Sequence, residues 1–346
     1  MQVERAMQTL ADLQLNGRSR PSRLYFAAVI CFLAAANLVI VWLAYRRIAL
    51  DQRFAAVAVC LNAYLAILFL LGNLESQTGL QAWIHHDRRK IWLFPSALLL
   101  PYLIYALGTQ SFHWFPFMKL LAYLVLPAGL LITVRRASDH VQWQDLVVIL
   151  MLWFPLDFRW MRDVWSWPGN SLAYSMNSLL ATCLGVFLFV VIRRLGGVGY
   201  HYRFQWHDWW IGLRNFLYFA PIAIPIGILT GFIRVSGRFA PPWQFLLSAV
   251  GIFIFVAIPE ELLFRGIIQN SLQKTLLKPL PALIVTSIIF GAAHLNNGPT
   301  QPDWRYFLLA SIAGLFYGNA YARTGNLMAP AIVHTLVDTV WRSFFR

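Results

Sequence analysis

The sequence predicts an all-α polytopic membrane protein, a transmembrane helical bundle of about ten membrane segments with an N-terminal interfacial helix. Hydrophobic residues make up 59% of its 346 positions and charged residues only 12%, and the mean hydropathy is +0.59. These values exceed what a soluble core of this length requires. Apolar runs near the ~20 residues that cross hydrocarbon as a helix recur along the chain, with short basic clusters beside them.

The first 23 residues are predicted to form an amphipathic interfacial segment. They are charged, and Val3, Met7 and Leu10 recur at helical spacing. The apolar run that follows is too long for the core of a signal peptide, so we expect the segment to stay attached and to lie at the membrane surface.

Six apolar runs predict membrane-spanning helices. Each is near the length that a helix needs to cross the hydrocarbon core. They are residues 24–45, 54–72, 91–107, 117–134, 172–192 and 210–233.

Four later segments are shorter or carry polar residues, which is typical of helices shielded by their neighbours rather than exposed to lipid. They are residues 244–258, 283–294, 306–320 and 328–341. One further run, 146–154, is too short to span a membrane unaided.

The net charge of +14 comes from basic clusters that adjoin the apolar runs. Nucleic-acid binding would need basic residues gathered on one soluble face, so no nucleic-acid partner is expected. The pattern fits instead the positive-inside rule for a protein surrounded by membrane lipid. The uncharged loop at 108–116 and the basic loop at 46–53 indicate opposite orientations, so the sidedness stays open.

The aromatic residues and the cysteines add no functional site to this prediction. The 15 Trp and 13 Tyr are explained as interfacial anchors, because many lie near the ends of apolar runs. Cys31, Cys60 and Cys183 lie inside such runs without paired spacing. They predict neither a disulfide framework nor a Cys-based metal site.

The chain is predicted to divide near residue 204. Residues 24–203 scatter their acids through loops and segment ends, and we assign them to an N-terminal transmembrane bundle of unknown role. Residues 240–346 hold only four acids and two histidines, and five of these six fall on three apolar segments. A charge near the bilayer centre costs about 2.5–3.5 kcal/mol, so such residues must pair or function. Any chemistry is therefore expected in the C-terminal bundle, residues 204–346.

The first of the three segments carries two adjacent carboxylates, Glu260 and Glu261. Because residues four apart share a helix face, Glu261 is expected to pair with Arg265, while Glu260 is rotated by about 100° and points elsewhere. Glu260 is then free to act as a base in a cavity. Pro259 predicts a helix start or kink, with both carboxylates near unsatisfied backbone amides.

The other two segments carry histidines. Spacing by four places Phe290 and His294 on one helix face, and His334 and Asp338 on another. A carboxylate base, a histidine beside it and a second histidine backed by an acid can activate water and stabilise an oxyanion. Each pair alone is also what a purely structural buried network contains, but their joint presence on three segments favours a function.

These residues resemble the motifs of a known protease family. Glu260-Glu261-x-x-x-Arg265, Phe290-x-x-x-His294 and His334-x-x-x-Asp338 have the order and spacing found in the CAAX prenyl protease and bacteriocin-processing family, the intramembrane glutamate-type proteases that include the Rce1-like enzymes. The resemblance covers residues 243–346. It implies a CAAX-protease-like catalytic bundle in which Glu260 and His294 activate water, His334 and Asp338 hold the oxyanion, and Glu261, Arg265 and Phe290 support them.

Position 338 departs from those family members that carry Asn there. A carboxylate cannot donate a hydrogen bond unless it is protonated, so Asp338 is expected to orient His334 and to favour its imidazolium form as the donor. A protonated Asp338 in a dry site is the alternative.

The sequence leaves metal dependence open. A Glu base requires no cofactor, whereas two histidines and two carboxylates can also ligate zinc, and the family is described in both ways. The His-Glu-x-x-His motif of zincins is absent, as are the Gly-x-Ser-Gly and Gly-x-Gly-Asp signatures of other intramembrane proteases.

The expected function is hydrolysis of a peptide bond in a membrane-associated or lipidated protein or peptide, by a multi-pass protein of a bacterial inner membrane. A non-catalytic immunity or binding protein of the same family is one alternative. An ion- or proton-coupled transporter is the other, because intramembrane Glu, His and Asp also mark ion pathways, although no internal repeat supports it. The sequence does not specify whether the substrate is prenylated.

Two further polar segments have both a functional and an ordinary explanation. Residues 296–303 form a polar turn after His294 that can rim an entrance or lie on the surface as a plain loop. The charges at positions 157, 159, 162 and 163 form either a second polar cluster at the interface or a solvated, charge-paired loop.

Overall fold

Helices form the whole framework of the residues that the computed structural model describes: 20–45, 48–134, 140–203, 205–237, 241–275, 278–298 and 301–345. Within these residues there is no strand, only an isolated bridge between Val235 and Phe345, so the predicted all-α class is confirmed. Seven helices of this part are long and apolar enough to cross a membrane, and the expected total of about ten segments is not confirmed. The seven are Arg23–Ala44, Gln52–Leu71, Arg89–Gly108, Trp114–Ile132, Ala173–Ile192, Trp206–Leu229 and Pro242–Thr275.

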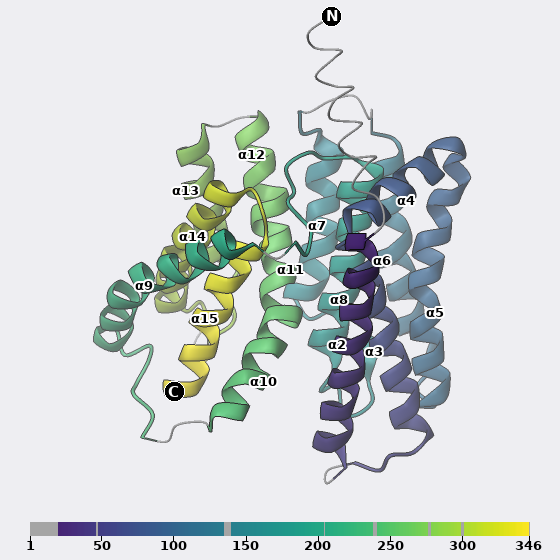
Figure 1. The fold of residues 1–346 in the computed structure, drawn as a ribbon, viewed down its shortest axis with the longest axis horizontal. Coiled ribbons are helices and arrows are strands. Elements are labelled where there is room, and N and C mark those ends of the chain that lie inside the picture. The colour runs from purple at the N-terminus through teal and green to yellow at the C-terminus, as the bar shows by residue number, and fades with distance from the viewer. Residues whose placement is uncertain are drawn as a thin grey trace, which may run out of the picture.

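The helices lie in two groups, α2 to α8 on one side of the molecule and α9 to α15 on the other (Figure 1). The first group consists of α2 (Arg20–Ala44), α3 (Gln52–Leu71), α4 (Leu74–His86), η1 (Arg88–Trp92), α5 (Leu93–Gly108), α6 (Trp114–Ile132), α7 (Trp143–Asp157), η2 (Arg162–Trp165), α8 (Ala173–Val186) and η3 (Phe187–Ile192). The second consists of α9 (Trp206–Leu229), α10 (Pro242–Ile252), η4 (Phe253–Ala257), α11 (Ile258–Glu261), η5 (Leu262–Gln269), α12 (Asn270–Thr275), α13 (Pro279–Ala292), α14 (Trp304–Thr324) and α15 (Met328–Phe344).

The helix that carries the two adjacent carboxylates is much longer than expected. The sequence predicts a short segment at 244–258, whereas α10 to α12 follow one another without a break as one 34-residue helix, Pro242–Thr275. A segment predicted from an uninterrupted run of apolar residues ends just before the first carboxylate, Glu260. The polar residues of this helix are satisfied by neighbouring helices, so the helix continues past them through the membrane.

Pro259 lies inside this long helix, so the expectation of a helix start at that position is wrong. A proline removes one backbone donor and clashes with the carbonyl four residues earlier. Here the π-helical turn η4 immediately precedes α11, and its wider hydrogen-bond spacing accommodates the ring. Glu260 and Glu261 therefore do not lie beside the free amides of a helix N-terminus.

Three other boundaries differ from the sequence-based expectation. α13 ends at Ala292, so His294 lies in the turn after the helix. The short apolar run at 146–154 belongs to α7, a 15-residue helix. α4 is a 13-residue helix that no apolar run indicates, and it begins at the N-cap Asn73, whose side chain accepts from the Ser76 N–H.

The two groups are joined by α8 and by the loop that follows η3. The span formed by α8 and η3 is the most buried of the seven. A buried ion pair between Arg193 and Asp145, 3.0 Å apart, fixes the start of the loop. Further along, Gly199 accepts from the Leu327 N–H at 3.1 Å. Gly199 has a φ of +71°, and a Cβ there would overlap the Gly325 carbonyl oxygen, so the close approach requires glycine.

Several predicted features lie outside the described residues. The interfacial segment predicted for 1–23 falls there except for positions 20–23, which belong to α2. Three further sets of positions also lie outside the described residues. They are the basic residues at 46–47 and 135–136, positions 299 and 300 of the polar turn, and residue 204, where the two bundles are predicted to divide.

Candidate active site

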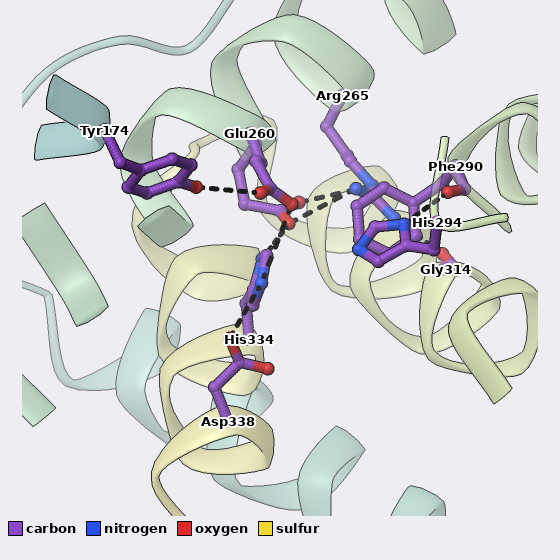
Figure 2. A network of polar contacts seen from close by, with 9 residues as sticks. Tyr174, Glu260, Arg265, Phe290, His294, Gly314, His334 and Asp338 are labelled. Atoms are coloured by element: carbon purple, nitrogen blue, oxygen red, sulfur yellow. Dashed lines mark hydrogen bonds and ion pairs between the residues drawn. The ribbon is translucent and has the colours of Figure 1, made fainter. Parts of the chain in front are cut away.

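Glu260 lies at the meeting point of helices from both groups. Figure 2 shows its carboxylate between Tyr174 of α8 and His334 of α15. The Tyr174 hydroxyl donates to Glu260 Oε1 at 3.4 Å, and His334 Nε2 lies 3.9 Å from Glu260 Oε2. The Glu260 side chain keeps 24% of its surface exposed, so a substrate or water can reach it.

Glu261 points away from its neighbour into a fully buried ion pair. Arg265 Nε lies 3.2 Å from Glu261 Oε2, and its Nη1 donates to Oε1 at 3.2 Å. A third donor, Nη2, reaches the Gly314 carbonyl oxygen at 3.2 Å. The guanidinium also covers the Phe290 ring, 4.4 Å from its centroid. The pairing expected from the i, i+4 spacing is thus present.

His334 contacts two carboxylates, Glu261 at one ring nitrogen and Asp338 at the other. Its Nδ1 donates to Glu261 Oε1 at 2.8 Å, and its ring stacks on Tyr317 at 4.7 Å between centroids. Asp338 Oδ2 lies 3.7 Å from the opposite nitrogen, Nε2. The expected contact between Asp338 and His334 is therefore present, and Glu261 adds a shorter contact to the other ring nitrogen. Spacing along one helix cannot reveal this contact between two helices.

His294 has a defined tautomer. Its Nδ1 lies 2.7 Å from the Phe290 carbonyl oxygen. A carbonyl oxygen only accepts, so Nδ1 must donate, and in the neutral ring Nε2 then carries the free lone pair. Phe290 thus contributes its backbone oxygen as well as a ring that packs against His294 at 4.6 Å. The turn after α13 presents His294 as a base.

Two cavities meet at these side chains. A larger one of about 670 Å³ lies between α7, α8 and η5, and a smaller one of about 230 Å³ is lined by α9, α14 and α15. Glu260, His294, Tyr174 and Tyr306 line both. His334 and Asp338 line the smaller cavity. All four predicted catalytic residues therefore line the smaller cavity.

The larger cavity is mostly apolar and has a charged margin. Leu152, Leu156 and Phe264 are among its apolar walls, and Arg159 and Arg162 line it from the loop after α7. The predicted second polar cluster is divided: Asp157 and the two arginines face this cavity, whereas Asp163 pairs with Lys119.

The polar turn after His294 lies beside the site. Asn297 lines both cavities. Asp303 begins α14 as its N-cap, and its backbone N–H donates to the Leu295 carbonyl oxygen at 2.8 Å. Arg305, at 3.0 Å from the Asp303 carboxylate, donates hydrogen bonds that hold the pKa of Asp303 below its usual range.

Sequence reasoning missed the tyrosines of the site. Tyr174, Tyr306 and Tyr317 all line the smaller cavity, yet the sequence explains tyrosines near segment ends as interfacial anchors. Tyr174 belongs to the N-terminal group, to which no chemistry was assigned. No motif distinguishes it, because its role depends on a contact between residues 86 positions apart.

The side chains do not form a metal site within the part of the chain that the structure describes. No three His, Cys, Asp or Glu side chains are arranged there so that they could hold one ion. Nδ1 of His334 is engaged by Glu261, and Nδ1 of His294 by a carbonyl oxygen.

Part of the chain matches a known protease family. Residues 241–340, which contain all three motifs, match the family model described as type II CAAX prenyl endopeptidase Rce1-like. This match confirms the resemblance predicted from the motifs. The chain is 30% identical over 88 residues to the uncharacterized protein YpbD of Bacillus subtilis (strain 168); the aligned part is 25% of this chain and 40% of that protein. No solved structure matches.

Proposed function

We propose that this chain, whose residues 241–340 match the Rce1-like family model, is an intramembrane endopeptidase. The observation that carries the proposal is that Glu260, His294, His334 and Asp338 line one cavity beside helices long and apolar enough to span a membrane. Ionisable side chains at such depth are costly unless they pair or function. Among the ionisable side chains of the site, Glu261 and Arg265 pair with each other away from the cavities, which leaves the other four for chemistry.

In this proposal Glu260 and His294 activate the attacking water. Glu260 takes the proton as the water oxygen bonds to the scissile carbonyl carbon. His294, whose Nε2 accepts, orients the same water and relays the proton to the leaving amine. The partial exposure of the Glu260 side chain supports the role of base, because a buried ion-paired carboxylate such as Glu261 would lose its partner on protonation.

His334 is proposed to stabilise the oxyanion. Its Nε2 faces Glu260 at 3.9 Å and Asp338 at 3.7 Å, and two nearby carboxylates favour the protonated ring. With Nδ1 fixed by Glu261, the Nε2–H is aimed at the cavity without a cost of reorientation during the reaction.

The proposed substrate is a peptide bond of a membrane-associated or lipidated protein. The larger cavity supports an amphiphilic substrate, since its walls are mainly apolar and its margin carries arginines. The proposed location is a bacterial inner membrane, in which the apolar spans are surrounded by lipid.

The test compares wild-type protein with Glu260→Gln and His294→Ala in lipid nanodiscs. Membrane proteins and peptides from the native host are incubated with each, and new termini are identified by mass spectrometry. Each substitution is expected to slow cleavage about 10²–10⁴-fold, the usual contribution of a general acid or base. The matched controls are Glu75→Gln and His113→Ala, two exposed residues of the first helix group. Undiminished cleavage by Glu260→Gln would refute the proposal.

Activity is expected to survive chelation, because no step of this proposal uses a metal. Treatment with EDTA or 1,10-phenanthroline, followed by assay in metal-free buffer, should leave the cleavage rate unchanged. Loss of activity that zinc restores, and that other divalent ions do not, would contradict the glutamate-base mechanism.

A further inference from the structure

We propose that Tyr174 is a catalytic hydrogen-bond donor of this site, contributed by the first helix group and lying outside the family-matched segment. Its phenol is assigned to the substrate carbonyl oxygen as that oxygen becomes negative. The inference rests on the proposed peptidase function. It adds a reacting group that none of the three motifs contains.

The position of Tyr174 supports the assignment. Tyr174 is the second residue of α8. The residue is 56% exposed and lines both cavities. Its hydroxyl contacts Glu260 Oε1 at 3.4 Å (Figure 2), which is longer than the usual hydrogen bond between oxygens. The phenol is therefore beside the proposed base, open to the cavity and weakly held.

Among the described residues, Tyr174 supplies the neutral side-chain donor that contacts Glu260, and the other reacting groups have no free neutral donor. Asp338 accepts only, unless it is protonated. The His294 Nδ1–H is occupied by the Phe290 carbonyl oxygen. His334 offers its Nε2–H, but two carboxylates lie within 4 Å of that nitrogen and compete for the proton. A phenol that can turn toward the substrate supplies the missing second donor, as oxyanion sites commonly use two.

The movement of charge explains how one hydroxyl serves two acceptors. Before attack, the negative charge is on Glu260, and the Tyr174 O–H points to it. During attack, a water proton passes to Glu260, the water oxygen bonds to the carbonyl carbon, and the carbonyl π electrons move to the carbonyl oxygen. Glu260 becomes a poorer acceptor in the same step that creates the oxyanion. The Tyr174 hydrogen bond then follows the charge, because charged acceptors bind donors more strongly.

Two other tyrosines border the site but fit this role less well. Tyr317 is 1% exposed and stacks on the His334 ring. Tyr306 packs edgewise against Trp341 and lies over His294, with ring centroids 5.5 and 4.8 Å apart. Both rings hold histidines or aromatic neighbours in place, whereas Tyr174 contacts the carboxylate of the proposed base.

The kinetic test is Tyr174→Phe, which removes one oxygen from an exposed ring. Cleavage by the purified protein in nanodiscs is expected to lose about 10²-fold in kcat, as the removal of one oxyanion donor does elsewhere. KM should stay within about twofold, because the interaction forms only in the transition state. Tyr218→Phe, on the exposed face of α9, is the control and should match wild type. Tyr306→Phe tests the competing assignment, in which Tyr306 is the hydrogen-bond donor.

A second measurement does not depend on cleavage. 3-Fluorotyrosine at position 174 keeps the shape and the hydroxyl, and its ¹⁹F resonance reports the acceptor of the O–H. Glu260→Gln is expected to move this resonance, while Glu75→Gln leaves it in place. Because it does not use the Phe variant, this ¹⁹F measurement tests the contact even if Tyr174→Phe fails to fold.

The outcomes separate the inference from the proposed function. If Glu260→Gln abolishes cleavage and Tyr174→Phe leaves kcat intact, the endopeptidase stands and the Tyr174 inference is wrong. A rise in KM alone, or a loss of kcat in Tyr306→Phe but not in Tyr174→Phe, also overturns it. If Glu260→Gln cleaves normally, the proposed function fails and the inference fails with it. An unmoved ¹⁹F resonance refutes the contact itself.

Discussion

Glu261 accepts from two cationic or polar partners at once, Arg265 within its own helix and His334 across to α15. Both contacts are fully buried. The ion pair therefore has two roles that substitutions can separate: it satisfies charge inside the bundle, and it fixes the ring that faces the cavity. An isolated buried charge is costly, whereas an apolar pair of similar volume is often tolerated.

Single loss of the guanidinium is expected to destabilise the protein strongly. Arg265→Met leaves the buried Glu261 carboxylate without its guanidinium partner and with His334 as its remaining contact, at a cost of about 3–5 kcal/mol. The double variant Glu261→Met with Arg265→Met should recover most of this stability but remain inactive, because His334 loses its orienting carboxylate. Reactivity of the buried Cys60 and Cys183 toward a thiol reagent during heating measures unfolding, in a Cys31→Ser background because Cys31 is exposed. An active double variant would show that Glu261 has no part in positioning His334.

The catalytic candidates could be predicted from the sequence because their motifs are local. Glu261 and Arg265 are four residues apart, and helical periodicity alone predicts their contact. The same rule predicted the contact between Asp338 and His334, which is present at 3.7 Å. It could not predict the shorter contact of His334 with Glu261, which is 73 positions away in sequence. Tyr174 was missed for the same reason. Contacts between helices follow from packing, which periodicity does not encode.

The contact between α13 and α14 sets the position of His294. A Cβ on Gly291 would overlap Ser311 Oγ and lie 2.7 Å from the Phe307 carbonyl oxygen. Gly291→Ala is therefore expected to push α13 away from α14, at a cost of about 1–3 kcal/mol, and to slow cleavage because His294 follows three residues later. Gly251→Ala, which meets no atom within 4 Å, is the control. Adding Ser311→Ala should relieve only part of the effect, because the backbone oxygen remains.

Asp303 ties the turn after His294 to the start of α14. Asp303→Ala removes the cap and is expected to cost about 0.5–2 kcal/mol. Because Arg305 lowers the folded-state pKa of Asp303, this stabilisation is complete above the unfolded value of about 3.9 and is lost as the pH falls through the lowered folded value. Thermal unfolding of wild type and Asp303→Ala should converge below about pH 4. Asp303→Asn keeps a capping group and loses the charge; if it behaves as Asp303→Ala, the hydrogen bond to the backbone has no role.

Helix ends were harder to predict than helix existence. All six of the long apolar runs correspond to helices, since a lipid-facing helix must be apolar along its length. The helix Pro242–Thr275 was underestimated because its second half carries Glu260, Glu261 and Arg265, which a hydropathy criterion takes as an end. In this bundle the polar residues mark the middle of a helix. Their partners on α14 and α15 are what allow it to continue.

The cavity that reaches Glu260 is shared by the two helix groups. α7 and α8 form one wall, and α11 with η5 forms the other. The first group therefore has a role at the site that its sequence does not indicate. Family resemblance covers only residues 241–340, so the wall formed by α7 and α8 is where substrate selection particular to this chain is expected.

Filling this cavity should affect substrates according to their size. Ala181 lies on α8 among the cavity walls, and Ala181→Phe places a ring in the space without removing a polar group. For a lipid-bearing peptide, kcat/KM is expected to fall about 10-fold or more, the equivalent of about 1.4 kcal/mol, while the same peptide without lipid is cleaved at a nearly unchanged rate. Ala28→Phe, exposed on α2, controls for the added ring. Equal losses for both peptides would mean that the substitution disturbs Glu260 and not the binding of the apolar chain. Equal rates in Ala181→Phe and wild type would mean that the substrate approaches Glu260 through the smaller cavity between α9, α14 and α15.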